Sequence, residues 1–147
     1  MKMGSKARAA ARLAAVQALY QHEMEETRLE QLLDEFHRHR LGAEIEDAQY
    51  VAADVAFFDD VVKGTIARRD EIDARLGEKL ASGWKIERLD RTMLQILRAG
   101  AYELMARADV PTGTAISEYL DVAHAFFDER EAKFVNGVLD AVAKAVR

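Results

Sequence analysis

Apolar residues recur every three or four positions through most of the 147-residue chain, with charged residues between them. This spacing places apolar side chains on one face of an α-helix, whereas a half-buried strand requires alternation with a period of two. Alanine, the residue with the highest helix propensity, is frequent, and Pro111 is the only proline. The pattern therefore predicts an all-α fold.

The apolar spacing predicts about seven helices. Ser5 is the expected N-cap of the first helix, and Thr112 or Thr114 that of the sixth, because a hydroxyl can accept from a free backbone N–H. Pro111 ends the fifth helix, since proline cannot continue one. The expected helices cover about residues 5–24, 28–40, 50–69, 70–80, 86–106, 115–127 and 129–145, with a connector at 43–48.

The sequence Ala-Ser-Gly-Trp at residues 81–84 interrupts the helical pattern near the middle of the chain. It predicts an internal boundary between an N-terminal sub-bundle of about residues 5–82 and a C-terminal sub-bundle of about 86–147. Both belong to a single expected domain, residues 1–147. Two glycines inside predicted helices, Gly64 and Gly137, are expected to permit close helix packing.

The first predicted helix carries an apolar stripe and, on another face, a set of basic residues. Four side chains form the stripe that is expected to face a core: Leu13, Val16, Tyr20 and Met24. The first 20 residues also contain four cations and no acid, namely Lys2, Lys6, Arg8 and Arg12, although the net charge of the chain is −5. A basic segment of this kind is typical of a polyanion contact, but many solvated helix starts are also basic.

Several classes of function have no residues to support them. Without cysteine there is no disulfide, thiolate zinc site or cysteine nucleophile. The histidines, His22, His37, His39 and His124, include no pair spaced i, i+4 for a metal, and we find no phosphate-binding glycine loop and no acid/base pair. We expect no enzymatic activity, metal or cofactor. No apolar run approaches membrane-spanning length and no signal peptide is evident, so a cytoplasmic location is expected.

The fifth predicted helix carries a second polar stripe opposite its apolar face. Arg91, Gln95, Arg98 and Tyr102 follow the spacing i, i+4, i+7 and i+11. Guanidinium, amide and aromatic groups together suit single-stranded RNA, because arginine binds phosphate and aromatic rings stack on unpaired bases. The alternative is an ordinary polar helix face.

Three segments resemble, in their order and spacing, the NusB family of bacterial transcription antitermination factors. They read ARAAARLAAVQALY at residues 7–20, ILRAGAYEL at 96–104 followed by DVP at 109–111, and KFVNGVLD at 133–140. The resemblance implies an all-helical fold of two sub-bundles. It also implies a non-catalytic protein that binds the boxA segment of nascent RNA together with the ribosomal protein NusE. In that family, this complex helps RNA polymerase to read through terminators in ribosomal RNA operons.

The resemblance also implies which residues make these contacts. The expected RNA-binding residues are Lys2, Lys6, Arg8, Arg12, Gln17, Tyr20, Arg98, Phe134 and Asn136. The expected partner-binding residues are Arg91, Tyr102 and Glu118. Phe134 and Tyr20 also continue apolar stripes, so a core position is the alternative for each. The chain departs from the family at Ala9 and Ala10, which are often basic in relatives, and at Arg130, where relatives are often acidic.

Two other interpretations remain. The first is a helical interaction module without RNA affinity, for example a homodimer built on the polar stripe of the fifth helix. The second is the RNA-binding domain of a larger methyltransferase that shares this fold, which is disfavoured because the 147 residues include no strand-rich catalytic portion.

Overall fold

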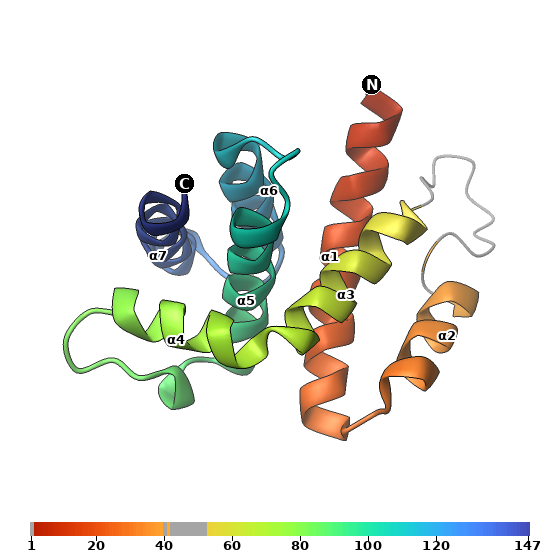
Figure 1. Cartoon of the computed structure of the whole chain (residues 1–147), viewed down its shortest axis with the longest axis horizontal. Coiled ribbons are helices and arrows are strands. Elements are labelled where there is room, and N and C mark those ends of the chain that lie inside the picture. The colour runs from red at the N-terminus through yellow and green to blue at the C-terminus, as the bar shows by residue number, and fades with distance from the viewer. Residues whose placement is uncertain (1, 40, 42–52) are drawn as a thin grey trace. The chain divides into compact units, whose positions relative to one another are not determined.

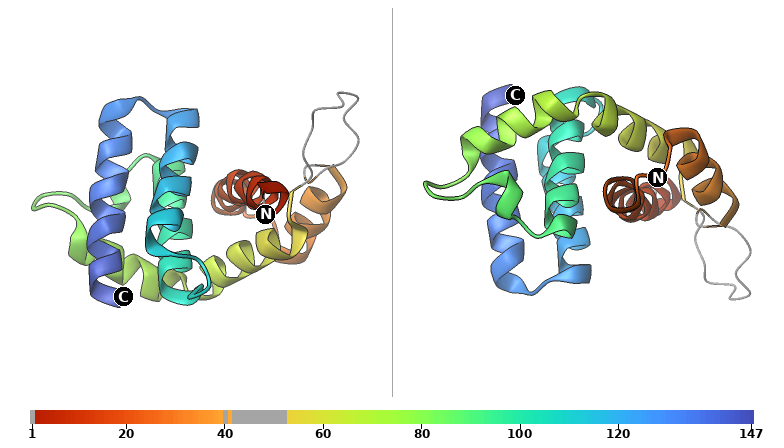
Figure 2. Two further views of the ribbon diagram at one scale, coloured as in Figure 1. Left: turned by 90° about the horizontal axis from the view of Figure 1, so that it is seen from above. Right: turned by 90° about the horizontal axis from the view of Figure 1, so that it is seen from below.

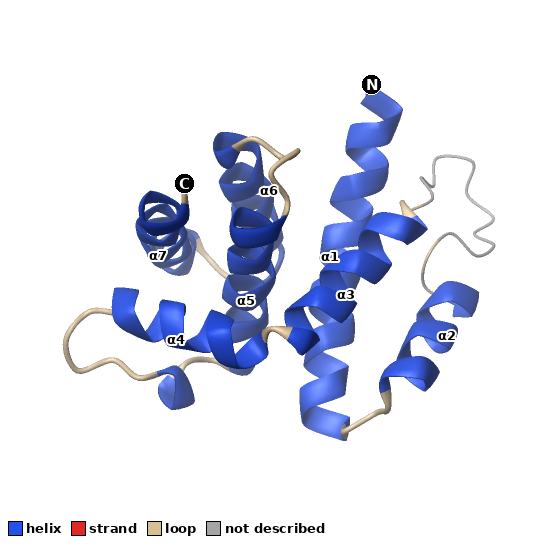
Figure 3. Ribbon diagram, viewed as in Figure 1, coloured by secondary structure: helices blue, strands red, loops and turns tan. Residues whose placement is uncertain are grey.

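The structure is a computed structural model that describes residues 2–39, 41 and 53–147. Over these residues the chain forms seven α-helices, one 3₁₀ turn and no strand, which confirms the all-α prediction (Figures 1 and 3). The elements are α1 Lys2–Glu25, α2 Leu29–His39, α3 Val55–Ala67, α4 Arg69–Lys79, the 3₁₀ turn Ile86–Arg88, α5 Arg91–Ala106, α6 Thr112–Phe126 and α7 Glu129–Val146.

Most helix boundaries lie close to the predicted ones, with four differences. Helix α1 begins at Lys2, so Ser5 lies inside it rather than capping it. Pro111 occupies the N-cap position of α6, so Thr112 is already helical and neither expected threonine caps that helix. The predicted fifth helix divides into a 3₁₀ turn and α5. The third helix is shorter than the predicted range 50–69, because residues 53 and 54 are not helical and α3 begins at Val55. The expected connector at 43–48 lies outside the described residues.

The chain divides into two compact units, Met1–Lys63 and Gly64–Arg147. The internal boundary expected at residues 81–84 is therefore misplaced. Helix α4 precedes that loop but packs against α5 and α7, so it belongs with the C-terminal helices. A loop that interrupts a helical pattern marks the end of an element, whereas a unit boundary depends on which elements share a core.

The first unit is built on α1, which packs against α2. Small side chains, including those of Ala11, Ala15 and Ala18, form the buried side of α1 together with Val16. Phe36 of α2 and Phe58 of α3 stack with ring centroids 5.5 Å apart. The predicted stripe of α1 is partly wrong, because Tyr20 and Met24 are 39% and 49% exposed. Alanines carry the core contact instead, since their small size lets another helix approach closely.

The second unit has α5 at its centre. Helices α5, α6 and α7 pack against one another, and α4 contacts both α5 and α7 (Figure 2). A Cβ atom at Gly64 would overlap the Tyr102 ring, and one at Gly100 would lie 2.9 Å from Leu139. The close packing expected at Gly64 is confirmed. At Gly137 the expectation is wrong, because that residue is exposed and an added Cβ would meet nothing.

Asp90 determines where α5 begins. Its side-chain Oδ1 accepts hydrogen bonds from the backbone N–H groups of Thr92 and Met93 at 2.8 and 3.1 Å. These N–H groups have no partner within the helix, so an aspartate at the N-cap stabilises the helix start. The apolar periodicity extends through the preceding 3₁₀ turn, which is why periodicity alone predicted one continuous helix.

The C-terminal Arg147 ties the end of α7 to the connection between α5 and α6. Its guanidinium donates hydrogen bonds to backbone carbonyls of Leu104 and Val110 at 2.9 and 2.7 Å, and to that of Arg107 at 2.8 Å. Carbonyls at the end of a helix lack intrahelical donors, so a cation there satisfies them. No helix within the described residues is both long enough and apolar enough to cross a membrane.

Candidate nucleic-acid interface

The basic residues of α1 lie in different environments. Lys6 is exposed, whereas Arg12 is only 3% exposed. The Cζ atoms of Arg8 and Arg12 lie 4.6 and 4.8 Å from the centroid of the Phe57 ring. The two arginines project together, as expected, but they project onto an aromatic ring of α3. Lys2 belongs to α1, but its side chain is not among those that the structure describes.

The start of α3 holds Phe57 in this position. Asp54 is followed by α3, and its Oδ1 accepts a hydrogen bond from the backbone N–H of Phe57 at 3.0 Å. The backbone N–H of Asp54 donates to the carbonyl of Ala7 at 3.0 Å, and its carboxylate lies 3.8 Å from the Nε of Arg8. Asp54 therefore fastens α3 to α1, and Arg8 and Arg12 help to hold the two helices together.

Three of the predicted RNA-binding residues share one exposed face of α1: Lys6, Gln17 and Tyr20. At 100° per residue, Lys6 and Gln17 point in nearly the same direction about three turns apart, and Tyr20 lies one turn beyond Gln17. We call these three residues the α1 face. It offers a cation, an amide and an aromatic ring to a ligand, while Arg8 and Arg12 point to another side of the helix.

The polar stripe predicted on α5 is largely buried, which corrects the expectation of a surface. Arg98 is 7% exposed, and its Nε and Nη2 atoms donate to the two carboxylate oxygens of Asp73 on α4, each at 2.9 Å. Gln95 is also buried, and the Tyr102 ring lies against Gly64. Only Arg91 is half-exposed, and its guanidinium donates to the carbonyls of Ile86 and Leu89, both at 2.8 Å. A rule of helical spacing could not have shown that α4 covers this face.

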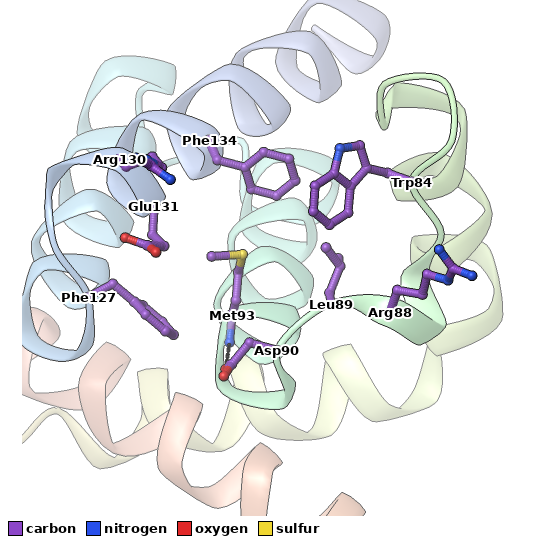
Figure 4. A pocket seen from close by; sticks show the side chains of 9 residues that line it. All are labelled: Trp84, Arg88, Leu89, Asp90, Met93, Phe127, Arg130, Glu131 and Phe134. Carbon is purple, nitrogen blue, oxygen red and sulfur yellow. Dashed lines mark hydrogen bonds between the residues drawn. The ribbon is translucent and has the colours of Figure 1, made fainter.

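A pocket in the second unit has a volume of about 490 Å³ (Figure 4). We call it the tryptophan pocket. Trp84 is 51% exposed, and its ring centroid lies 5.9 Å from that of Phe134 with an angle of 47° between the ring planes. Leu89 and Met93 supply apolar side chains below the two rings. The residues that line the pocket are Trp84, Arg88, Leu89, Asp90, Met93, Phe127, Arg130, Glu131 and Phe134.

The charged residues of the tryptophan pocket lie mainly at its rim. Arg88 and Arg130 are exposed and lie at opposite ends of the pocket in Figure 4. Asp90 is engaged in capping α5. Asp128, just outside the pocket, caps α7. The pKa of its carboxyl is lowered by a side-chain hydrogen bond with Glu131 and by the backbone N–H of Arg130.

Phe134 and Asn136 were both predicted to contact RNA, but only Phe134 lines the tryptophan pocket. Asn136 is exposed on α7, and Glu118, a predicted partner contact, is half-buried on α6. Sequence reasoning did not assign Trp84, Arg88 or Arg130 to a binding site. A tryptophan beside a glycine was the available signal, but the segment that carries Trp84 was interpreted only as a break between helices, and Arg130 only as a departure from the family.

The fold and these surfaces define an all-helical protein that exposes cationic and aromatic groups of the kind that contact nucleic acid. The family model described as "NusB family" matches residues 9–144, and the chain belongs to the NusB family. It is 76% identical over 146 residues to the transcription antitermination protein NusB of Novosphingobium aromaticivorans, an alignment that covers 99% of each chain.

Solved structures give the same result. The structure of T. maritima NusB matches with a TM-score of 0.76 at 31% identity, covering 93% of this chain and 90% of the other. A chain in a crystal structure of the antitermination factors NusB and NusE in complex with dsRNA matches with a TM-score of 0.74 at 25% identity. That match covers 95% of this chain and 98% of the other.

Proposed function

We propose that this chain is an RNA-binding transcription antitermination factor that binds boxA RNA of ribosomal RNA operons together with the ribosomal protein NusE. The observation that carries the proposal is the likeness, over 95% of the chain, to a NusB that was crystallised with NusE and dsRNA. The protein acts by binding and not by catalysis, as part of the antitermination complex on RNA polymerase in the cytoplasm.

In the first unit, the α1 face supplies the RNA contacts. Lys6 neutralises a phosphate, Gln17 hydrogen bonds to a base or sugar, and the exposed Tyr20 ring stacks on an unpaired base. Arg8 is half-exposed beside Phe57, so its guanidinium can bind a phosphate while it stays in contact with the Phe57 ring of α3. Arg12 has a mainly structural role, because its side chain is buried.

In the second unit, Phe134 and Asn136 supply the contacts on α7. The buried positions of Arg98 and Tyr102 favour indirect roles for these residues, in which they hold α5 in place beneath the binding surfaces. The same burial disfavours a homodimer built on the α5 stripe, because that surface is already covered within the unit. Arg91 and Glu118, both half-exposed, remain the proposed contacts to NusE.

The test is a titration of labelled single-stranded boxA RNA, with and without NusE, alongside a scrambled strand and a duplex of equal length. We expect the boxA strand to bind more tightly than the scrambled strand, and NusE to increase the affinity. Equal affinity for all three RNAs, or no binding, would favour the non-RNA interaction module.

The salt dependence identifies the phosphate contacts. Each phosphate contact on a single strand contributes about −0.7 to the slope of log affinity against log salt. The double variant Lys6→Ala/Arg8→Ala should therefore flatten the slope by about one to one and a half. Its matched control is Arg28→Ala/Arg38→Ala, which removes two exposed arginines of the same unit. A slope that changes equally in both variants would contradict the assignment to α1.

A further inference from the structure

We propose that the tryptophan pocket receives one unstacked base of a single-stranded RNA, which stacks on the exposed surface of the Trp84 ring beside Phe134. This inference rests on the proposed function, because it names a binding pocket for one nucleotide of the same RNA. It adds Trp84 as the principal stacking residue and adds Arg88 and Arg130 as phosphate contacts at the rim.

The aromatic geometry supports a base rather than an aliphatic ligand. The Trp84 ring is half-exposed although it lies beside Phe134, and the two rings are tilted by 47° rather than stacked face to face. The two rings contact each other at one side of the pocket, and the largely buried side chains of Leu89 and Met93 line its floor (Figure 4). A planar heterocycle that enters there would cover exposed aromatic surface, which favours stacking of any base.

The size of the pocket agrees with a nucleotide. Ligand pockets of small-molecule size have volumes of roughly 300–1,000 Å³ and are mainly apolar, with a few polar groups at defined positions. At about 490 Å³, the tryptophan pocket lies within this range. A single aliphatic side chain of a protein partner would leave much of it unfilled.

The two arginines at the rim suit an anionic ligand. Arg88 and Arg130 are both exposed, and they lie at opposite ends of the pocket, where the phosphates on either side of an inserted nucleotide would pass (Figure 4). Two carboxylates also line the pocket: Asp90 accepts two backbone hydrogen bonds of α5, and the half-buried Glu131 forms a side-chain hydrogen bond with Asp128. The exposed cations at its two ends are therefore the groups placed to contact the phosphates.

The loop that carries Trp84 is held in a defined conformation. Gly83 has a φ angle of +91°, a region that glycine adopts without strain, and the backbone N–H of Trp84 donates to the carbonyl of Ala81 at 3.0 Å. Arg91 fixes the following turn through the carbonyls of Ile86 and Leu89. The stacking surface is therefore largely preformed before a base arrives, which reduces the entropic cost of binding.

Trp84 is the only tryptophan of the chain, so its fluorescence reports on this pocket alone. We would titrate the intact protein with single-stranded boxA RNA and record tryptophan emission together with the anisotropy of a labelled 3′ end. We expect emission to be quenched with the same midpoint as the anisotropy change. Binding by anisotropy without quenching would overturn the pocket proposal while leaving the proposed function intact, whereas no binding by anisotropy either with or without NusE would overturn both.

Two variants of Trp84 distinguish the loss of base stacking from a loss of folding stability. Trp84→Ala should weaken RNA binding about tenfold, because one base–aromatic stack is worth roughly 1–3 kcal/mol. Trp84→Phe keeps a ring and should stay within about threefold of the parent chain. Trp84 is half-exposed, so neither change should alter the unfolding midpoint by much. An affinity of Trp84→Ala equal to that of the parent chain would overturn the proposal.

The salt dependence of RNA affinity tests whether the two rim arginines contact phosphates. Arg88→Ala and Arg130→Ala should each flatten the salt slope by about 0.7, and Arg28→Ala, the exposed control in the other unit, should not. Adding NusE without RNA distinguishes a protein ligand. Quenching of Trp84 by NusE alone, with no further change on adding RNA, would show that a protein side chain occupies the pocket and would overturn the proposal.

Discussion

Each of the two units buries one arginine that was predicted to contact RNA, but a different interaction holds each guanidinium in place. In the first unit, Arg12 lies over the face of the Phe57 ring. In the second, Arg98 forms a two-point ion pair with Asp73. A cation–π contact is worth about 0.5–2 kcal/mol, whereas removing one partner of a buried ion pair costs about 3–5 kcal/mol. Equal burial therefore does not mean equal importance for stability.

The largest expected effect lies in the second unit. Arg98→Met should lower the free energy of unfolding by about 3 kcal/mol, because it leaves the Asp73 carboxylate without the guanidinium that holds it between helices. Urea unfolding followed by circular dichroism would measure the loss. The double variant Arg98→Met/Asp73→Leu should recover much of it, since no uncompensated charge remains. If the double variant is as unstable as the single one, the ion pair is not the cause.

The glycines give the next largest contrast. Gly64→Ala should destabilise the protein by about 1–3 kcal/mol, since its Cβ would enter the Tyr102 ring. Gly137→Ala should instead stabilise it by about 0.5–1 kcal/mol, because that glycine is exposed, helical and free of neighbours. Thermal unfolding of both variants gives the comparison. A similar change in Tm for the two variants would contradict the packing described for α5.

The first unit should respond more weakly to loss of its buried arginine. Arg12→Met retains most of the apolar length but removes the charge above Phe57, so a loss of about 1 kcal/mol is expected. The measurement is again urea unfolding, with Phe57→Leu as the partner variant and the double variant closing the cycle. A coupling energy close to zero would show that the ring does not stabilise the guanidinium.

The smallest expected effect is a pH dependence at the surface of α4. The pKa of Glu71 is lowered from its ordinary value of 4.5, chiefly by the hydrogen bond from Arg68. A carboxyl whose pKa falls on folding adds stability above its unfolded pKa, and that stability is lost as the pH falls through the lower folded pKa. Glu71→Gln should therefore be less stable than the parent chain at neutral pH and equal to it in strong acid.

The control for this effect is Glu78→Gln, which removes an exposed carboxylate from the same helix. Unfolding midpoints measured from neutral to acid pH would compare the two variants. A difference between Glu71→Gln and the parent chain that persists below both pKa values would contradict the electrostatic explanation.

Helical spacing predicted the elements well because it depends on local geometry. The seven helices appear near their expected positions, and deviations occur where a polar contact overrides the apolar period. Asp90 starts α5 later than its apolar residues indicate, because its carboxylate satisfies the backbone N–H groups of Thr92 and Met93. Such a cap can be recognised in a sequence, but the continuing apolar pattern favoured the earlier start.

The candidate sites were harder to predict because exposure is a property of the packed molecule. Lys6, Gln17 and Tyr20, three of the residues predicted to contact RNA, share an exposed face of α1. Gln95, Arg98 and Tyr102 have equally regular spacing on α5 but are buried. No spacing rule distinguishes these two helices, since the difference lies in which neighbours cover each face. Trp84 was missed because it lies in a loop, and helical spacing assigns a loop residue to no face.

The sequence by itself determined the all-helical architecture, the approximate helix boundaries and the family, since local propensity and ordered motifs are present in the chain before it folds. Only the tertiary structure decided which arginines are available to a ligand. A guanidinium is long and flexible, so whether it meets Phe57, Asp73 or solvent depends on helices that are distant in the sequence. The same long-range packing brought Trp84 and Phe134 together into one pocket.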